Sequence, residues 1–282
     1  MVVAVSGGPD STALLVAARE SGLDVVAAHY DHALRAGSDL VAEQVQALCE
    51  RLGVELVRER RATSMPRGSV QAGARALRYA FFDRALGETG SKSIALAHTA
   101  DDLVEGVALH MLRGCGLAGF RGMPAVRGHY VRPLLDVWRS EVIDFLNRRG
   151  IVAYADPSNV DRNYARVRAR MDLLPALERD RPGILRRFHG AALRGSRWHE
   201  DAREHASAAL DAQPFTIAGL SLLPEPVAAE VLAILFRRAG GAEPGLSRSH
   251  LDSMLRLARG GRGGRGVDLP RGLRFRIVGD RM

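Results

Sequence analysis

The sequence predicts an α/β protein in which a parallel-sheet domain precedes a smaller, mainly helical C-terminal domain. The first 135 residues alternate short apolar segments with helical patterns, which is typical of a parallel sheet covered by helices on both faces. Three polar motifs directly follow apolar segments, and ligands bind at the carboxyl ends of parallel strands. Charge also divides the chain: residues 1–120 hold 12 basic and 14 acidic residues, whereas residues 121–282 hold 28 and 18.

Four strand–helix pairs are expected along the first domain. The strands are expected at residues 2–5, 25–30, 54–57 and 94–97. The helices are expected at residues 11–22, 38–53, 70–87 and 101–113, with a further helix at 138–149. The apolar runs are too short for helices, and the segments between them have helical periodicity. Successive strands joined through helices lie parallel, so the pattern predicts one parallel sheet.

The rest of the chain becomes helical and rich in arginine from about residue 166. Helices are expected at 186–212, 226–239 and 247–258, and a terminal strand pair at 267–279. Proline and glycine in PFTIAG and SLLPEP are expected to end the long helix. We therefore predict a catalytic domain at residues 1–185 and a basic helical domain at 186–282.

Composition excludes several classes of protein. The 282 residues are 46% hydrophobic and 26% charged, which is ordinary for a globular protein. No apolar run reaches the roughly 18 residues of a membrane span, and the first residues lack the pattern of a signal peptide. Cys49 and Cys115 are the only cysteines, so no disulfide framework is expected. We therefore predict a cytoplasmic protein without a membrane segment.

The sharpest motif is SGGPDS, residues 6–11, between the first strand and the first helix. Gly7 and Gly8 allow backbone N–H groups to turn toward a phosphate, Ser6 and Ser11 add hydroxyl donors, and the helix N-terminus favours an anion. Asp10 would repel a phosphate, so it is expected to hold Mg²⁺ or to orient the loop. The alternative is a glycine-rich turn in which Ser11 or Asp10 caps the helix.

Three carboxylates share one face of the expected helix at 101–113. Asp101 and Glu105 are four residues apart, and Asp102 and Glu105 are three apart. Such a cluster at the ligand edge of the sheet can hold Mg²⁺ or a substrate ammonium group. The alternative is a set of acids that stabilises the helix dipole.

The second part of the chain suggests a polyanion as partner. Ten arginines fall within residues 162–197 against three acids, and arginine side chains bind phosphates with two parallel hydrogen bonds. The alternative is a solvated helix face. RGGRGGRG, residues 259–266, fits either a flexible RNA-contacting strip or a turn.

Five ordered motifs resemble the PP-loop family of N-type ATP pyrophosphatases and, within it, the tRNA(Ile)-lysidine synthetases. The motifs are SGGPDS (6–11), HYDHALR (29–35), AHTADDLVEGVALHMLRGCGLAGFRGM (97–123), RPLLDVWRSEVIDFLNRRG (132–150) and ADPSNVDRNYARVRARMDLLPAL (155–177). The resemblance covers residues 2–180 and implies a PP-loop ATP pyrophosphatase fold.

The resemblance also implies a reaction. ATP would adenylate the C2 oxygen of the wobble cytidine in the CAU anticodon of tRNA(Ile), and free L-lysine would then displace AMP. The lysidine formed would change decoding from AUG to AUA. ATP and Mg²⁺ are the implied cofactors, tRNA(Ile) and free lysine the implied partners, and a homodimer is left open.

The motifs and the resemblance together give the expected site residues. The expected catalytic residues are Asp10, Asp102 and Glu105, and Asp102 and Glu105 are also expected to bind the lysine ammonium. The expected ATP-binding residues are Ser6, Gly7, Gly8, Pro9, Asp10, Ser11, His29, Asp31 and His98. The expected tRNA-binding residues are Arg35, Arg113, Arg166, Arg168 and Arg170, and Mg²⁺ is expected at Asp10 and Asp101.

Leu103, Gly106 and Val167 depart from the family pattern, which leaves the fine geometry of the site undecided.

Two alternatives to the implied function stay open at this point. Another PP-loop enzyme, such as a tRNA thiolase or a small-molecule amide synthetase, would share the ATP chemistry. Cys115 is expected to be structural, which weighs against a thiolase. The second alternative is a non-enzymatic, arginine-rich RNA-binding protein with a decayed ATP site.

Overall fold

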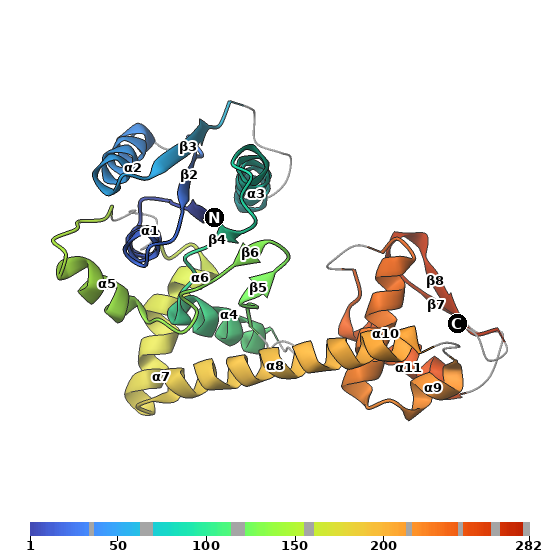
Figure 1. Ribbon diagram of the computed structural model, residues 1–282. Helices are drawn as coiled ribbons and strands as arrows, with labels where there is room; N and C mark the ends of the chain where they lie inside the picture. Colours follow the sequence, from blue (N-terminus) through green and yellow to red (C-terminus); the bar gives the residue numbers. More distant parts are fainter. Residues whose placement is uncertain are drawn as a thin grey trace. The chain divides into compact units, whose positions relative to one another are not determined.

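The structure is a computed structural model of the chain (Figure 1). It describes residues 1–33, 37–62, 70–113, 122–154, 161–212, 216–241, 245–260 and 266–278. The described residues form two compact units, the first comprising Met1–Arg113 and Gly122–Gly190 and the second Ala191–Met282. The domain boundary expected at residue 185 falls within helix α8, Ile184–Asp211, which begins in the first unit and ends in the second.

A six-stranded sheet forms the centre of the first unit. Its strands are β1 (Val2–Ala4), β2 (Val26–Asp31), β3 (Glu55–Arg60), β4 (Ile94–Ala95), β5 (Val126–Arg127) and β6 (Tyr130–Val131). They are ordered β3-β2-β1-β4-β6-β5, and every neighbouring pair is parallel except β5 and β6. This confirms the predicted α/β fold class with its parallel sheet.

Helices cover both faces of this sheet because its strands are apolar on both sides. The helices that follow the strands are α1 (Pro9–Glu20), α2 (Ser38–Leu52), α3 (Val70–Glu88), α4 (Ala100–Leu112) and α5 (Arg139–Asn147). Val3 and Val5 pack with α1 and α2 on one face, whereas Val2 and Ala4 pack against Phe81 and Phe82 of α3 on the other. The crossovers therefore bring the carboxyl ends of β1, β2 and β4 to one edge.

A three-part helical segment follows α5 in the first unit. It consists of α6 (Ala165–Arg168), a π-helix (Ala169–Leu173) and α7 (Leu174–Asp180). Leu174 packs against Val104 and Ala108 of α4, with Leu173 and Leu177 beside them. This apolar contact fixes the arginines of the segment next to the carboxylates of α4.

The second unit is mainly helical, as predicted. Besides the end of α8, it contains α9 (Ile217–Leu222), α10 (Glu225–Arg238), α11 (Arg248–Gly260) and the antiparallel strands β7 (Gly266–Asp268) and β8 (Arg274–Arg276). Its core includes Val231, Leu232 and Met254. Helices α8, α10 and α11 and the terminal strand pair lie where the sequence predicts them.

Two elements were not expected. The long helix α8 ends at Asp211 as predicted, but the segment that follows contains the short helix α9, whose first turn is capped by Thr216 Oγ1 accepting from the Gly219 N–H at 3.1 Å. The hairpin of β5 and β6 was not predicted, because two-residue strands carry no detectable alternation. Among the described residues, no helix is both long enough and apolar enough to cross a membrane.

Candidate active site

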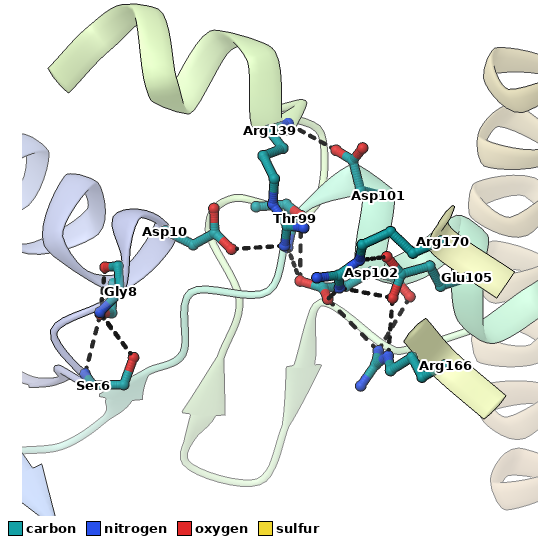
Figure 2. Close-up of polar contacts among 11 residues, drawn as sticks. Ser6, Gly8, Asp10, Thr99, Asp101, Asp102, Glu105, Arg139, Arg166 and Arg170 are labelled. Carbon is teal, nitrogen blue, oxygen red and sulfur yellow. Dashed lines mark hydrogen bonds and ion pairs between the residues drawn. The ribbon is translucent and has the colours of Figure 1, made fainter. Parts of the chain in front are cut away.

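Residues from three strand ends meet at the carboxyl edge of the sheet. The loop at residues 6–11 follows β1, Asp31 ends β2, and His98 to Glu105 follow β4. Because β1 lies between β2 and β4, these segments become neighbours in space. Figure 2 shows the loop, the acids of α4 and three arginines from later in the chain around one region.

The SGGPDS loop holds a defined conformation through its own serines. Ser11 Oγ donates to the Gly8 carbonyl at 3.0 Å and accepts from the Ser6 N–H at 3.0 Å. Gly7 has a φ of 85°, and a Cβ there would lie 2.6 Å from Val41 Cγ1, so no other residue fits. Gly8 directly precedes α1, and Pro9 occupies its first turn. The loop thus presents a helix N-terminus, which suits a phosphate group.

Asp10 and Asp101 both contact Arg139, the first residue of α5. Arg139 Nη2 lies 3.0 Å from Asp10 Oδ2, and the Arg139 backbone N–H donates to Asp101 Oδ2 at 2.7 Å. Asp10 Oδ1 is buried and has no hydrogen-bond partner. Burial raises the pKa of Asp10, and the opposing charge of Arg139 does not fully offset it. Arg139 thus connects helix α1, through Asp10, with helix α4, through Asp101.

The Mg²⁺ expectation can be compared with these donors. Carboxylate oxygens are the ligands Mg²⁺ prefers, and the unpartnered Asp10 Oδ1 fits one such ligand. Within the described ranges, no group of three or more His, Cys, Asp or Glu residues forms a metal site. The unpartnered Asp10 Oδ1 is thus the observation that is compatible with a Mg²⁺ ligand at this place.

Asp102 is fixed at the start of α4 by Thr99. The Thr99 N–H donates to Asp102 Oδ2 at 2.9 Å, and Thr99 Oγ1 lies 3.2 Å from the same oxygen. Burial alone would raise the pKa of Asp102, but the bond from Thr99 and the charge of Arg166 hold that pKa below its usual range. Asp102 is therefore an ionised carboxylate at neutral pH, with Oδ1 directed away from the cap.

Glu105 is fully buried, at 0% exposure, and two arginines surround it. Arg166 Nε donates to Glu105 Oε2 at 3.0 Å, and Arg170 binds both oxygens, with Nε on Oε1 and Nη2 on Oε2 at 2.9 Å. Asp102 Oδ1 lies at longer range, 3.7 Å from Arg166 Nη2 and 3.5 Å from Arg170 Nη2. Two carboxyl groups and two guanidinium groups thus form a partly buried cluster, with Glu105 at its buried centre (Figure 2).

The remaining expected nucleotide residues lie on the same edge. His29 Nδ1 lies 2.8 Å from the Val5 carbonyl, and its buried Nε2 has no partner. Asp31 accepts hydrogen bonds from the Ala33 N–H at 2.8 Å and from Ser38 Oγ at 3.2 Å, so it orders the loop after β2. Burial lowers the pKa of His98 to about 4, with the nearby arginine charges adding to the effect. His98 is therefore neutral at pH 7.

Among the described residues expected to bind tRNA, Arg166 and Arg170 converge on Glu105, whereas Arg113 and Arg168 do not contact it. Arg35 lies outside the described residues. Arg113 is exposed just after α4, and Arg168 Nη1 donates to the Arg162 and Asn163 carbonyls at 2.8 and 2.9 Å. Arg166 and Arg170 contact the acids of α4, so binding of RNA by these two side chains stays a prediction.

Sequence reasoning missed Arg139 and Thr99 as parts of the site. Arg139 lies in the RPLLDVWRSEV motif, where the resemblance offered a position but no role. Thr99 precedes an acid by three residues at a helix start, which is the signature of a capping box. That signal was present in the sequence for Thr99, whereas nothing local connects Arg139 with Asp10.

Comparisons with known proteins identify relatives of this chain. Residues 1–177 match the family described as PP-loop domain. The tRNA(Ile)-lysidine synthases of Thermobifida fusca and Salinispora arenicola are each 35% identical, over 96% and 99% of this chain and 86% and 89% of theirs. The Geobacillus kaustophilus synthase is 31% identical over 97% of this chain, which spans 64% of that relative's length.

A solved structure supports the fold. The U34-tRNA thiolase NcsA from Methanococcus maripaludis superposes with a TM-score of 0.57 over 70% of each chain at 16% identity. At that identity the likeness concerns the fold alone. Because the family match covers residues 1–177 and two relatives are 35% identical over nearly the whole chain, the chain belongs to the tRNA(Ile)-lysidine synthase family of PP-loop ligases.

Proposed function

We propose that the chain joins free L-lysine to C2 of the wobble cytidine in the CAU anticodon of tRNA(Ile), with ATP and Mg²⁺ as cofactors. The product would decode AUA instead of AUG. The observation that carries this proposal is the pair of neighbouring carboxyl groups of Asp102 and Glu105, which contact the same two arginines on the sheet edge that also carries the SGGPDS loop. An amine-binding site beside a phosphate-binding loop is what ligation through an adenylate requires.

The nucleotide-binding role falls to the loop after β1. Its serine hydroxyls and the N-terminus of α1 would bind the pyrophosphate portion of ATP. Asp10 Oδ1 and Asp101 are the nearby carboxylate oxygens that would hold Mg²⁺, which when bound neutralises phosphate charge. His29 and His98, each with an unpartnered buried ring nitrogen, would contact the nucleotide.

The reaction then needs two displacements. The cytosine C2 oxygen attacks the α-phosphorus and releases pyrophosphate. The lysine ε-ammonium gives up one proton, and the free amine then attacks C2 as the bond to the adenylate oxygen breaks and AMP leaves. Asp102 is the better-placed acceptor for that proton, because its Oδ1 has only long contacts to the two arginines whereas Glu105 is fully paired. The base must leave its stack to reach this site.

The arginine-rich second half would bind the tRNA backbone in the cytoplasm. Residues 121–282 hold 28 basic and 18 acidic residues, and Arg187, Arg194 and Arg197 of α8 are exposed. Their guanidinium groups suit phosphate oxygens.

Incubation with tRNA(Ile) transcript, ATP–Mg²⁺ and labelled lysine, followed by nucleoside analysis, tests the proposal. Labelled lysidine is the expected product, and a transcript with U at the wobble position should stay unlabelled. An Asp10→Ala variant should yield none. Release of pyrophosphate without incorporation of lysine would instead indicate another PP-loop reaction, and an absence of ATP turnover would indicate an RNA-binding protein.

A further inference from the structure

The acidic pair proposed to bind lysine already holds two cations from the same chain. Glu105 accepts hydrogen bonds from both Arg166 and Arg170, and Asp102 lies within 3.7 Å of each. These two guanidinium groups balance the two carboxylates. A third cation entering the cluster would leave one positive charge uncompensated in a partly buried site, which is costly. Binding of an ammonium group therefore favours the departure of one arginine.

The two arginines are held unequally. Arg170 forms a fork on Glu105, with one nitrogen on each carboxylate oxygen, and its side chain is 23% exposed. Arg166 contacts Glu105 through Nε alone, and its side chain is 45% exposed. Forked pairs are stronger than single hydrogen bonds, and exposed pairs contribute little. Arg166 is thus the cation that leaves at lower cost.

Access to the acids points to the same residue. Glu105 has no exposed surface, and the Asp102 side chain is 13% exposed. Arg166 is the most exposed of the four side chains in the cluster, so moving it opens the carboxylates to solvent. The π-helix at Ala169–Leu173 contains Arg170 but not Arg166, which lies in the preceding α6. The two arginines are therefore supported by different backbone segments.

We propose that Arg166 is a displaceable internal cation that the ammonium group of the substrate replaces on Asp102 and Glu105, while Arg170 stays in place. Arg166 thereby sets how tightly the site takes a free amine, and it acts as a specificity-determining residue. The inference rests on the proposed function, in which these acids bind lysine. Under this inference Arg166 competes with lysine for the two acids. If Arg166 instead only held the acids in position, it would favour lysine binding.

Binding of labelled lysine in equilibrium dialysis, without tRNA, tests the inference. Arg166→Ala removes the competing cation, so lysine affinity should rise about fivefold or more over wild type. Arg166→Gln keeps a hydrogen-bond donor for Glu105 without the charge, and it should show the same direction if the alanine variant folds poorly. Arg162→Ala is the matched control, because Arg162 pairs with Asp172 at 3.3 Å and not with the acids of α4. Its lysine affinity should equal that of wild type.

The outcomes separate this inference from the proposed function. Weaker or unchanged lysine binding in both Arg166 variants, with thermal unfolding showing folded protein, overturns the displacement. Asp102→Asn should weaken lysine binding at least tenfold if the acids form the amine site. If Asp102→Asn leaves lysine binding unchanged, the amine-site assignment fails, and the displacement fails with it. If Asp102→Asn weakens binding but the Arg166 variants do not tighten it, only the displacement fails.

Discussion

Arg139 Nη2 lies 3.0 Å from Asp10 Oδ2, although 129 residues separate the two in the chain. The backbone N–H of the same arginine holds Asp101 at 2.7 Å. One residue of α5 therefore sets the spacing between the nucleotide loop and the acids of α4. The charge of Arg139 also lowers the pKa of Asp10, which opposes part of the rise that burial causes and favours the ionised carboxylate.

Asp10→Asn should lose most turnover while keeping the fold. Burial raises the pKa of Asp10, so the ionised carboxylate lowers the free energy of unfolding at pH values above that pKa. The neutral amide of asparagine removes this destabilisation. The lost pair with Arg139 acts in the opposite direction, so the net change should stay within about 1 kcal/mol. Lysidine formation and urea unfolding measure the two effects. The exposed Asp39→Asn is the control, and activity above a tenth of wild type would contradict the role.

Glu105→Ala should destabilise the protein strongly. It leaves Arg166 and Arg170 in a partly buried cluster with Asp102 as their remaining carboxylate. Removing one partner of a buried ion pair costs about 3 to 5 kcal/mol, more than the usual effect of a point mutation. Urea unfolding checks this value. A loss below about 1 kcal/mol would mean that the cluster does not support the fold.

Asp102→Asn should raise the apparent KM for lysine more than that for ATP. Loss of a charge-assisted contact costs about 1.5 to 3 kcal/mol, or roughly ten- to a hundredfold in affinity. Glu105→Ala should act in the same direction, but its effect on stability makes it a less clean probe. Steady-state kinetics with each substrate varied in turn provide the measurement. An unchanged lysine KM would leave Asp102 a structural cap bound to Thr99.

The sequence predicted the position of the site but not which side chains contact one another within it. SGGPDS and the acids near 101 follow apolar strands, and parallel topology brings strand ends to one edge, so local pattern sufficed. The partner of Glu105 could not be predicted in that way. Nothing in the sequence distinguishes one arginine from another within residues 162–197. The packing of Leu174 on Val104 and Ala108 decides which of them face α4.

Long-range contacts also explain why the β5–β6 hairpin and the role of Arg139 were not predicted. β5 and β6 have two residues each, too few for any period to show; β6 is held by pairing with β4, and β5 by pairing with β6. Arg139 finds Asp10 only after α5 packs beside α1, where Val142 and Leu146 contact Ala13. Long-range packing rather than local propensity selects these contacts.

Gly106→Ala should stabilise the protein by about 0.5 to 1 kcal/mol, because glycine inside a helix costs backbone entropy. Gly106 lies within α4, and a Cβ there meets nothing within 4 Å. Thermal unfolding measures the gain. Gly122→Ala serves as the opposite case, since its φ is 58° and a Cβ would overlap Leu103 Cδ1. It should lower stability by about 1 kcal/mol or more. A loss of stability in Gly106→Ala would show that this departure from the family pattern is required for packing.

Binding of tRNA should weaken steeply with salt, and the exposed arginines of α8 should account for much of the slope. Each phosphate neutralised contributes roughly 0.7 to 0.9 to the slope of log K against log salt. Changing Arg187, Arg194 and Arg197 together to glutamine should therefore flatten the slope by about 2 to 2.7, with ATP affinity unchanged. Changing Arg166, Arg168 and Arg170 should flatten it less, because Arg166 and Arg170 contact Glu105. Filter-binding titrations of wild type and both triple variants make the comparison. Parallel lines for wild type and the α8 variant would mean that these arginines form only a solvated face.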